Sequence, residues 1–330
     1  MASRVNHGIQ RVLGKLEASL NSGNYYEAHQ MYRTLYFRYL SQKRYEDLLD
    51  LLYDGAVLLL QHDQHESGAD LGILFVDVLN KSEQETGILL SYNFVKITNM
   101  FNLMKAGSPE RDTFLNNALR WSSKNNNSKC GHPDLHKMIA QIFWKEKNYV
   151  MARQHFVYSH DGVGCASMLA ELHQLRGYSN EIDLFITQVV LQYLCLQNLK
   201  TAQEVFDSYT SVHPKIQIGP PYLLPLLNFI HFLLKSIQLS SLSKYQVLCQ
   251  QYQLSLNRDP SFRMYLDKIA QLYFDAPPPT SRPRRQGLFG NLLQSFFNGL
   301  DDGDSDTDDQ SSIRQNSNTA STSQATQELD

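Results

Sequence analysis

The chain has few cysteines, and they are badly placed for cross-linking. Its 330 residues contain only Cys130, Cys165, Cys195 and Cys249, which lie far apart and in no paired spacing. A secreted disulfide framework or a zinc module would cluster them. Three of the four stand in apolar helical surroundings, where a free cysteine behaves as a small hydrophobe. The cysteines therefore predict a reduced, cytosolic protein.

Long hydrophobic runs are also missing. No window approaches the roughly 20 uninterrupted apolar residues that cross a bilayer, and the N-terminus lacks the apolar stretch of a secretory signal. The densest window, 222–234, is interrupted by Pro225, Asn228 and His231. We expect this window to form a buried helix, and we expect no stable membrane insertion.

The chain has little net charge, but its charged residues are unevenly distributed. The net charge is −3, yet residues 1–44 carry seven Lys or Arg against two Glu, and residues 301–330 carry eight Asp or Glu against one Arg. The N-terminal basic residues alternate with buried-type residues and form no run that could follow a phosphate backbone. This pattern predicts an acidic protein partner for the basic end and no nucleic-acid binding.

Strand and phosphate-loop signals are nearly absent. Only Lys215–Ile218 alternates between polar and apolar residues, and it is either an extended crossing or one arm of a small β-hairpin. No Gly-x-x-x-x-Gly-Lys-Ser/Thr motif occurs. Nucleotide binding therefore has no candidate.

The chain does contain a recurring sequence motif with the features of a helix start. Asn24-Tyr25-Tyr26-Glu27-Ala28 recurs as Asn148-Tyr149-Val150-Met151-Ala152 and as Asn198-Leu199-Lys200-Thr201-Ala202, with a looser copy at Arg44-Tyr45. Each copy places a polar turn, a large side chain and a small residue where two helices would meet. This arrangement is typical of stacked helical hairpins. With helical periodicity over 5–274, it predicts an all-α, right-handed, tetratricopeptide-like α-solenoid of about fourteen helices over residues 1–275.

The composition changes abruptly at Ala276. Residues 276–286 read as an extended Pro/Arg linker, and residues 287–300 as a short amphipathic helix with one apolar face. That helix could dock on protein or lie on a membrane, and docking is favoured because the helix itself carries no Lys or Arg. Residues 301–330 read as a disordered acidic tail, in which Ser305 and Thr307 are candidates for acidophilic phosphorylation.

Three groups contain the residue types found in catalytic or metal-binding sites. His160-Asp161 stand before Cys165, but a nucleophilic triad is assembled from distant elements, so a turn with a buried cysteine is favoured. His132 and His136, like His62 and His65, have the spacing of metal ligands but lack a third one. We therefore expect no catalytic residues, no metal and no cofactor.

The helix expected over 25–39 carries two aromatic stripes. Tyr25, Tyr32, Tyr36 and Tyr39 form one, and Tyr26, His29, Arg33 and Phe37 form the other. One neighbouring helix cannot cover both stripes, so one of them could face solvent as a protein-binding surface. The alternative is that two flanking helices bury both stripes.

Several distinctive runs follow one another along the chain. The first is Gly23-Asn24-Tyr25-Tyr26-Glu27-Ala28-His29-Gln30-Met31-Tyr32-Arg33-Thr34-Leu35, and further runs include Ala118-Leu119-Arg120-Trp121-Ser122-Ser123, Gly131-His132-Pro133-Asp134-Leu135-His136 and Phe143-Trp144-Lys145-Glu146-Lys147-Asn148-Tyr149. These runs closely resemble the Golgi-to-ER traffic protein four family. Together they span about residues 8–300. Members of this family are α-solenoid subunits of the cytosolic complex that loads tail-anchored membrane proteins onto a targeting ATPase.

The resemblance implies two docking surfaces and no enzyme activity. The N-terminal half would bind the targeting ATPase, and the C-terminal half would bind a ubiquitin-like-domain adaptor or a large ubiquitin-like, BAG-type scaffold protein. By position in the matching runs, the ATPase surface would comprise Arg11, Lys15, Tyr26, His29, Arg33 and Asp70. The adaptor or scaffold surface would comprise Tyr222, Leu226, Phe229, Tyr265 and Ile269.

A second hypothesis belongs to a different class of assembly. Stacked helical hairpins also build subunits of proteasome-lid and signalosome-type particles. Those subunits usually end in a winged-helix module with strands, and residues 240–275 lack a strand pattern. The bridging role is therefore favoured over this alternative.

Overall fold

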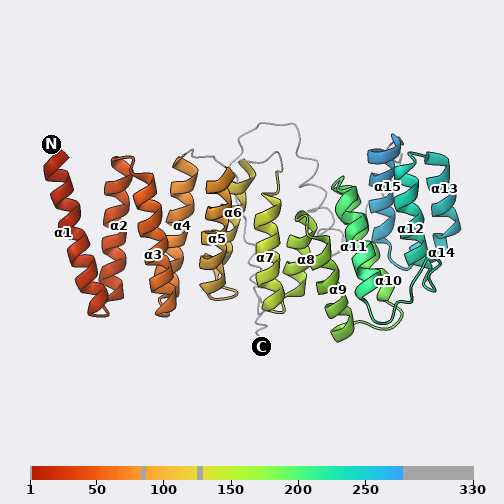
Figure 1. Ribbon diagram of the computed structural model, residues 1–330, viewed down its shortest axis with the longest axis horizontal. Coiled ribbons are helices and arrows are strands. Elements are labelled where there is room, and N and C mark those ends of the chain that lie inside the picture. The colour runs from red at the N-terminus through yellow and green to blue at the C-terminus, as the bar shows by residue number, and fades with distance from the viewer. Residues whose placement is uncertain (1, 83–86, 125–128, 278–330) are drawn as a thin grey trace, which may run out of the picture.

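The protein is a row of helices stacked side by side (Figure 1). The computed structural model describes residues 2–82, 87–124 and 129–277. The first eight helices are α1 (Ala2–Asn21), α2 (Tyr25–Ser41), α3 (Tyr45–Gln61), α4 (His65–Ser82), α5 (Gly87–Leu103), α6 (Pro109–Lys124), α7 (Pro133–Lys145) and α8 (Tyr149–Tyr158). The remaining seven are α9 (Gly162–Arg176), α10 (Ile182–Cys195), α11 (Leu199–Val212), α12 (Pro225–Gln238), α13 (Leu242–Gln251), α14 (Gln253–Leu256) and α15 (Ser261–Phe274).

The helical-repeat prediction is confirmed for the described residues. Helices pack against the next one along the chain and, in many cases, against the one after that, such as α2 on α4, α3 on α5 and α4 on α6. The described residues contain fifteen helices, in line with the expectation of about fourteen, and the shortest is α14 with four residues. At the C-terminal end the order is less regular, since α15 returns to pack on α10 (Figure 1).

One turn geometry is used six times to join helices. Gly23, Lys43, Asp63, Lys147, Gln197 and Ser240 all have a left-handed backbone, with φ between 49° and 73°. At each turn, the N–H of the next residue bonds to a carbonyl five residues back, as from Asn24 to Ser19 and from Asn198 to Tyr193. This is the pattern of a Schellman C-cap, which satisfies the last carbonyls of the preceding helix.

The recurring motif forms the N-terminus of the helix that follows each of three turns. Asn24, Asn148 and Asn198 each accept a hydrogen bond at the side chain from the backbone N–H three residues on. This caps the exposed donors of the new helix. Four residues after each cap the small residue is fully buried, as Ala28, Ala152 and Ala202. The recurring motif therefore caps the new helix and allows it to pack closely against its neighbour.

No strand occurs in the described part of the chain. Lys215–Ile218 lies in the irregular connection between α11 and α12, so the small β-hairpin considered from the sequence does not form there. The connection is held by other bonds. The Lys215 N–H bonds to the His213 ring, and Tyr222 and Asn228 exchange a backbone-to-amide pair at 2.8 and 2.7 Å.

The predicted C-terminal elements lie outside the described residues. The linker at 276–286 is described only up to residue 277, and the amphipathic helix, the acidic tail, Ser305 and Thr307 all follow it. These assignments stay predictions. Among the helices that are described, none combines the length and apolar character needed to span a bilayer.

Candidate partner-binding surfaces

The two aromatic stripes on α2 have different environments. Tyr32, Tyr36 and Tyr39 of the first stripe are buried in the core. In the second stripe, Tyr26 and Phe37 are 74% and 62% exposed, and Arg33 is also exposed. The arrangement with one solvent-facing stripe is therefore the one that occurs. We call Tyr26, Arg33 and Phe37 the α2 stripe.

His29 belongs to the second stripe by spacing but is buried by an interaction with α4. Its Nε2 lies 2.8 Å from Asp70 Oδ2, and Arg33 Nη1 lies 3.6 Å from the same oxygen. The hydrogen bond from His29, with the positive charge of Arg33, holds the pKa of Asp70 below its usual value. The structure thus brings together His29, Arg33 and Asp70, as the sequence prediction grouped them.

A second polar cluster lies two helical turns further along the same pair of helices. The Tyr36 hydroxyl donates to Asp77 Oδ2 at 2.5 Å, and Lys81 Nζ donates to Asp77 at 2.6 Å and to Tyr36 at 3.1 Å. Both clusters join residues 41 positions apart. The sequence prediction missed this cluster. The common spacing of seven residues, from His29 to Tyr36 and from Asp70 to Asp77, was the available signal.

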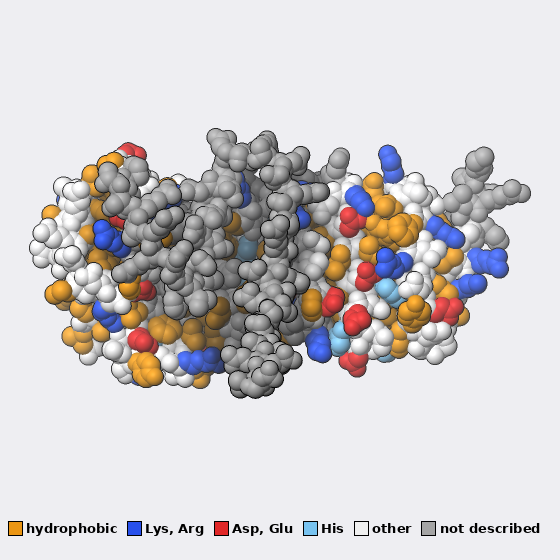
Figure 2. All heavy atoms as spheres, turned by 180° about the vertical axis from the view of Figure 1, so that it is seen from behind, with side chains coloured by type: hydrophobic (Ala, Val, Ile, Leu, Met, Phe, Trp, Pro, Cys, Tyr) orange, Lys and Arg blue, Asp and Glu red, His pale blue; other side chains and the backbone are white. Residues whose placement is uncertain are grey.

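The remaining predicted residues of the N-terminal surface lie on α1. Arg11 and Lys15 are exposed, one helical turn apart, on the helix that packs against α2. A bond from Arg38 of α2 to the Gly8 carbonyl, 3.0 Å long, ties the two helices together. Several Lys and Arg side chains lie on the surface at this end of the molecule, at the right of Figure 2, with Asp and Glu side chains among them. The basic end predicted from the sequence is thus a solvated surface.

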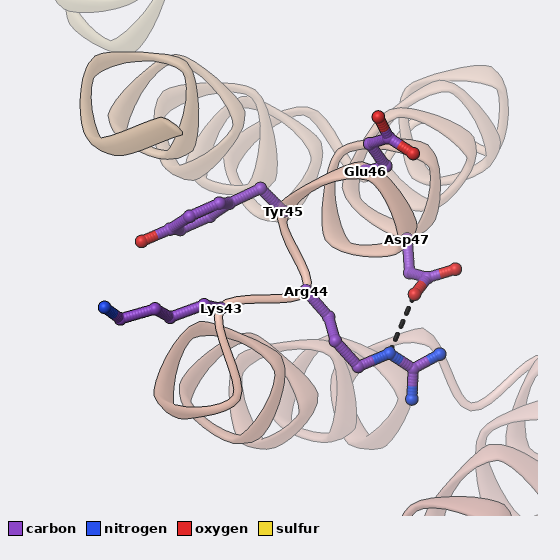
Figure 3. A pocket seen from close by; sticks show the side chains of 5 residues that line it. All are labelled: Lys43, Arg44, Tyr45, Glu46 and Asp47. Atoms are coloured by element: carbon purple, nitrogen blue, oxygen red, sulfur yellow. Dashed lines mark hydrogen bonds and ion pairs between the residues drawn. The ribbon is translucent and has the colours of Figure 1, made fainter. Parts of the chain in front are cut away.

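A shallow hollow marks the turn between α2 and α3 (Figure 3). Its lining residues, Lys43 to Asp47, are consecutive in the chain, and Arg44 Nε donates to Asp47 Oδ2 at 2.7 Å. The Lys43 and Tyr45 side chains extend in the same direction, away from that pair. Because a single turn supplies every lining residue, the hollow has no facing groups with which to enclose a ligand.

Four of the five residues predicted to bind the adaptor or scaffold are in the core. Leu226, Phe229, Tyr265 and Ile269 are at most 1% exposed, so in this fold they are not accessible to a partner. Their role here is to pack α12 and α15 into the stack. Apolar contact residues and apolar core residues have the same sequence pattern, which is why the prediction selected them.

Tyr222 is the predicted residue at this end that reaches the surface. It is partly buried, with its ring edge-on to Phe206 at 5.9 Å between centroids. Ile218 and Leu223, which the prediction did not name, are highly exposed on the same connection. Partner binding at this end stays a prediction, and these three side chains are its accessible candidates.

The residues that resembled a catalytic triad have structural roles. Cys165 is fully buried, and burial raises the pKa of its thiol to about 12, so it is not a thiolate at neutral pH. Asp161 Oδ1 accepts from the Gly164 N–H at 2.9 Å and caps α9. The turn with a buried cysteine is therefore confirmed.

The histidines with metal-ligand spacing also have other partners. The His132 ring caps α7 by accepting from the Asp134 N–H. His136 Nε2 lies 2.8 Å from the Cys130 carbonyl, and His136 Nδ1 lies 2.9 Å from His155 Nδ1. Within the described ranges, no three His, Cys, Asp or Glu side chains are grouped so as to hold a metal ion.

Comparison with known proteins agrees with this architecture. The model of the family described as Golgi to ER traffic protein 4 matches residues 42–297. The chain belongs to this family. The Golgi to ER traffic protein 4 homolog of Oryzias latipes is 50% identical over 297 residues, covering 90% of each chain. The homolog of Homo sapiens is 48% identical over 308 residues, covering 93% of each.

A solved structure extends the comparison to three dimensions. The crystal structure of C. therm. Get4 superimposes with a TM-score of 0.73 at 27% sequence identity. The match covers 88% of this chain and 96% of that one. The family member described here therefore shares the helical fold of that protein.

Proposed function

We propose that this family member is a non-enzymatic scaffold of a cytosolic complex that hands tail-anchored membrane proteins to a targeting ATPase. It would bridge that ATPase to a ubiquitin-like adaptor or to a large ubiquitin-like, BAG-type scaffold protein, for insertion into the ER membrane. The observation that carries the proposal is the α2 stripe, which exposes two large aromatic rings and a guanidinium on a helix fixed into the stack. Family membership favours this role over a proteasome-lid or signalosome subunit.

The ATPase would bind at the N-terminal end. Tyr26 and Phe37 offer apolar area, and Arg33, Arg11 and Lys15 offer positive charge to an acidic surface. Aromatic and arginine side chains are the usual anchors of protein interfaces. The His29–Asp70 bond fixes the position of α2 relative to α4, so the stripe would be presented with little loss of entropy on binding.

The adaptor or scaffold would bind at the C-terminal end of the stack. Tyr222, Ile218 and Leu223 provide accessible apolar surface on a connection that the Asn228 amide holds in place. In a helical-repeat protein, two surfaces so far apart along the stack are expected to act independently. Such independence is what a bridging subunit needs.

Co-elution tests the proposal directly. We would mix the full chain with the tail-anchored-protein targeting ATPase, with and without ATP, at low and at high salt, and resolve the mixture by size. A complex that weakens with salt is expected, since exposed charges are screened. Absence of any complex under all four conditions would contradict the bridging role while leaving the fold unaffected.

A further inference from the structure

Arg153 of α8 is a half-buried cation that forms no ion pair with any acidic residue among those the structure describes. Its Nη1 donates to the neutral Gln188 amide oxygen of α10 at 2.6 Å. In the part of the chain that the structure describes, no carboxylate forms an ion pair with it. Burial lowers the pKa of this guanidinium, as expected when a cation loses water without gaining an anion. A guanidinium has five N–H donors, so Arg153 has capacity for a further acceptor.

A polar row continues from Arg153 across three helices. Gln192 lies one turn beyond Gln188 on α10, and its Nε2 donates to the Tyr265 hydroxyl of α15 at 3.1 Å. The buried Gln192 Oε1 has no donor among the described residues. The row therefore joins α8, α10 and α15, and Arg153 is the point at which it can bind a further acceptor.

Exposed apolar side chains occur on the two outer helices of this row. Val150, about one turn before Arg153 on α8, is 72% exposed, and Met264, next to Tyr265 on α15, is 43% exposed. Both α8 and α15 pack on α10, so these side chains belong to the helices on either side of the row. A surface of this kind suits a segment that combines an apolar face with a carboxylate.

Such a segment follows α15 in the same chain. Leu288, Phe289, Leu292, Leu293, Phe296, Phe297 and Leu300 form the apolar stripe expected of a helix over 288–300, and Asp301 and Asp302 come directly after it. Anionic residues therefore follow the apolar stripe directly, and a carboxylate is an acceptor that Arg153 can bind.

The lengths permit this segment to fold back along α15. Tyr265 lies nine residues before the end of α15, or about 14 Å along the helix axis. Residues 278–287 can span about 33 Å when extended. A helix over 288–300 would be about 20 Å long. Running antiparallel to α15, it would bring Asp301 to the level of the first turns of α15, where Tyr265 lies.

We propose that residues 288–300 dock as a helix on the surface formed by α8, α10 and α15 of their own chain, with Asp301 or Asp302 paired to Arg153. The docked segment covers Val150 and Met264 and supplies the anion that Arg153 lacks. This inference is independent of the proposed bridging role. A result that contradicts one of the two proposals leaves the other unaffected.

Hydrogen exchange of the full-length protein tests the docking. Amides of 288–300 are expected to exchange at least tenfold more slowly than in a free peptide of the same sequence, at high and at low protein concentration. Replacing Arg153→Gln, or Asp301→Asn with Asp302→Asn, is expected to reduce that protection about tenfold. Combining the two sets of changes should reduce it no further, because they remove one interaction.

Matched controls distinguish the effect of the proposed ion pair from the effect of the net charge of the tail. Asp308→Asn with Asp309→Asn removes the same charge from the same tail and should leave the protection unchanged. Phe296→Asp should abolish it and make the tail exchange like the free peptide. Protection that Arg153→Gln leaves intact would overturn the proposal. So would unprotected amides in the unaltered chain, or protection that disappears on dilution, which would indicate a second copy as the occupant.

Discussion

Arg111 at the start of α6 and Glu146 at the end of α7 form a two-pronged ion pair across 35 residues of sequence. The two guanidinium nitrogens donate to the two carboxylate oxygens at 3.1 and 2.5 Å. Arg111 is 2% exposed, stacks on the Phe101 ring at 4.0 Å, and donates its Nε to the Phe101 carbonyl at 3.1 Å. One side chain thus joins the ends of α5, α6 and α7.

Replacing Arg111→Ala is expected to destabilise the protein by about 3 kcal/mol, because it leaves Glu146 and the Phe101 carbonyl without their partner. Urea unfolding followed by circular dichroism would measure the loss. The matched control is Arg44→Ala, which breaks an exposed pair with Asp47 and should change the unfolding midpoint little. Equal, small effects of the two variants would contradict the role assigned to Arg111.

Stability is expected to fall as the pH drops from neutral towards about 4, and the His136–His155 pair accounts for part of this fall. His213, whose pKa burial also lowers to about 4, contributes over the same interval. Burial lowers the pKa of His136 from 6.5 to about 4 and that of His155 well below 6.5. The unfolded chain therefore takes up protons below about pH 6.5 that the folded chain refuses until about pH 4. The loss is at most about 1.4 kcal/mol per pH unit for each proton.

His136→Gln should flatten this pH dependence, measured as the urea midpoint across the same pH interval. His160→Gln is the matched control, since His160 is exposed and its replacement should leave the slope unchanged. A pH dependence that is equally steep in all three proteins would show that other groups cause it.

Gln197→Gly is expected to stabilise the protein by about 0.5–1 kcal/mol. Gln197 is exposed and has a left-handed backbone, with φ of 57°, which is unfavourable for any residue with a β-carbon. Gln203→Gly, six residues later inside α11, should instead destabilise by about 1 kcal/mol. Opposite signs in the urea midpoint would confirm the turn geometry, whereas a loss of stability in both variants would contradict it.

Local features of this fold could be predicted from the sequence because they depend on neighbouring residues. The turn at Asn148 and the small Ala152 after it lie four residues apart, and capping and close approach follow from that spacing. The pair Tyr36–Asp77 spans 41 residues, and its existence depends on how α2 and α4 are placed. The seven-residue spacing places Tyr36 on the face of His29 and Asp77 on the face of Asp70, but it does not show that the two faces meet.

The C-terminal site prediction has a different limit. Phe229 and Tyr265 are large and apolar, which fits a contact residue and a core residue equally well. Only the packing of α12 and α15 on α10 shows that both are inside. The exposed Ile218 was missed because Lys215–Ile218 reads as a strand arm or an extended crossing. Leu223 was missed because it lies in the window 222–234, which we expected to form a buried helix, whereas α12 begins only at Pro225.

Charge reversal at the N-terminal end is expected to weaken ATPase binding specifically. Arg33→Glu with Lys15→Glu puts two negative charges on a surface proposed to meet an acidic partner. Binding measured by calorimetry should weaken by a few kcal/mol if the charges are desolvated at the interface. Adaptor or scaffold binding should not change, because sites far apart in a repeat protein behave independently.

Two results would separate the interface from the fold. Lys200 and Lys244 are exposed on the C-terminal half of the protein. Lys200→Glu with Lys244→Glu makes the same change in net charge as the N-terminal variant and should leave ATPase binding intact. Loss of both partners in the Arg33 and Lys15 variant, together with a lower unfolding midpoint, would mean that the substitutions damaged the stack. Unchanged ATPase affinity in a variant that remains folded would remove the α2 stripe and α1 from the interface. Binding would then have to be sought on the opposite side of the N-terminal half, where α3 and α5 pack together.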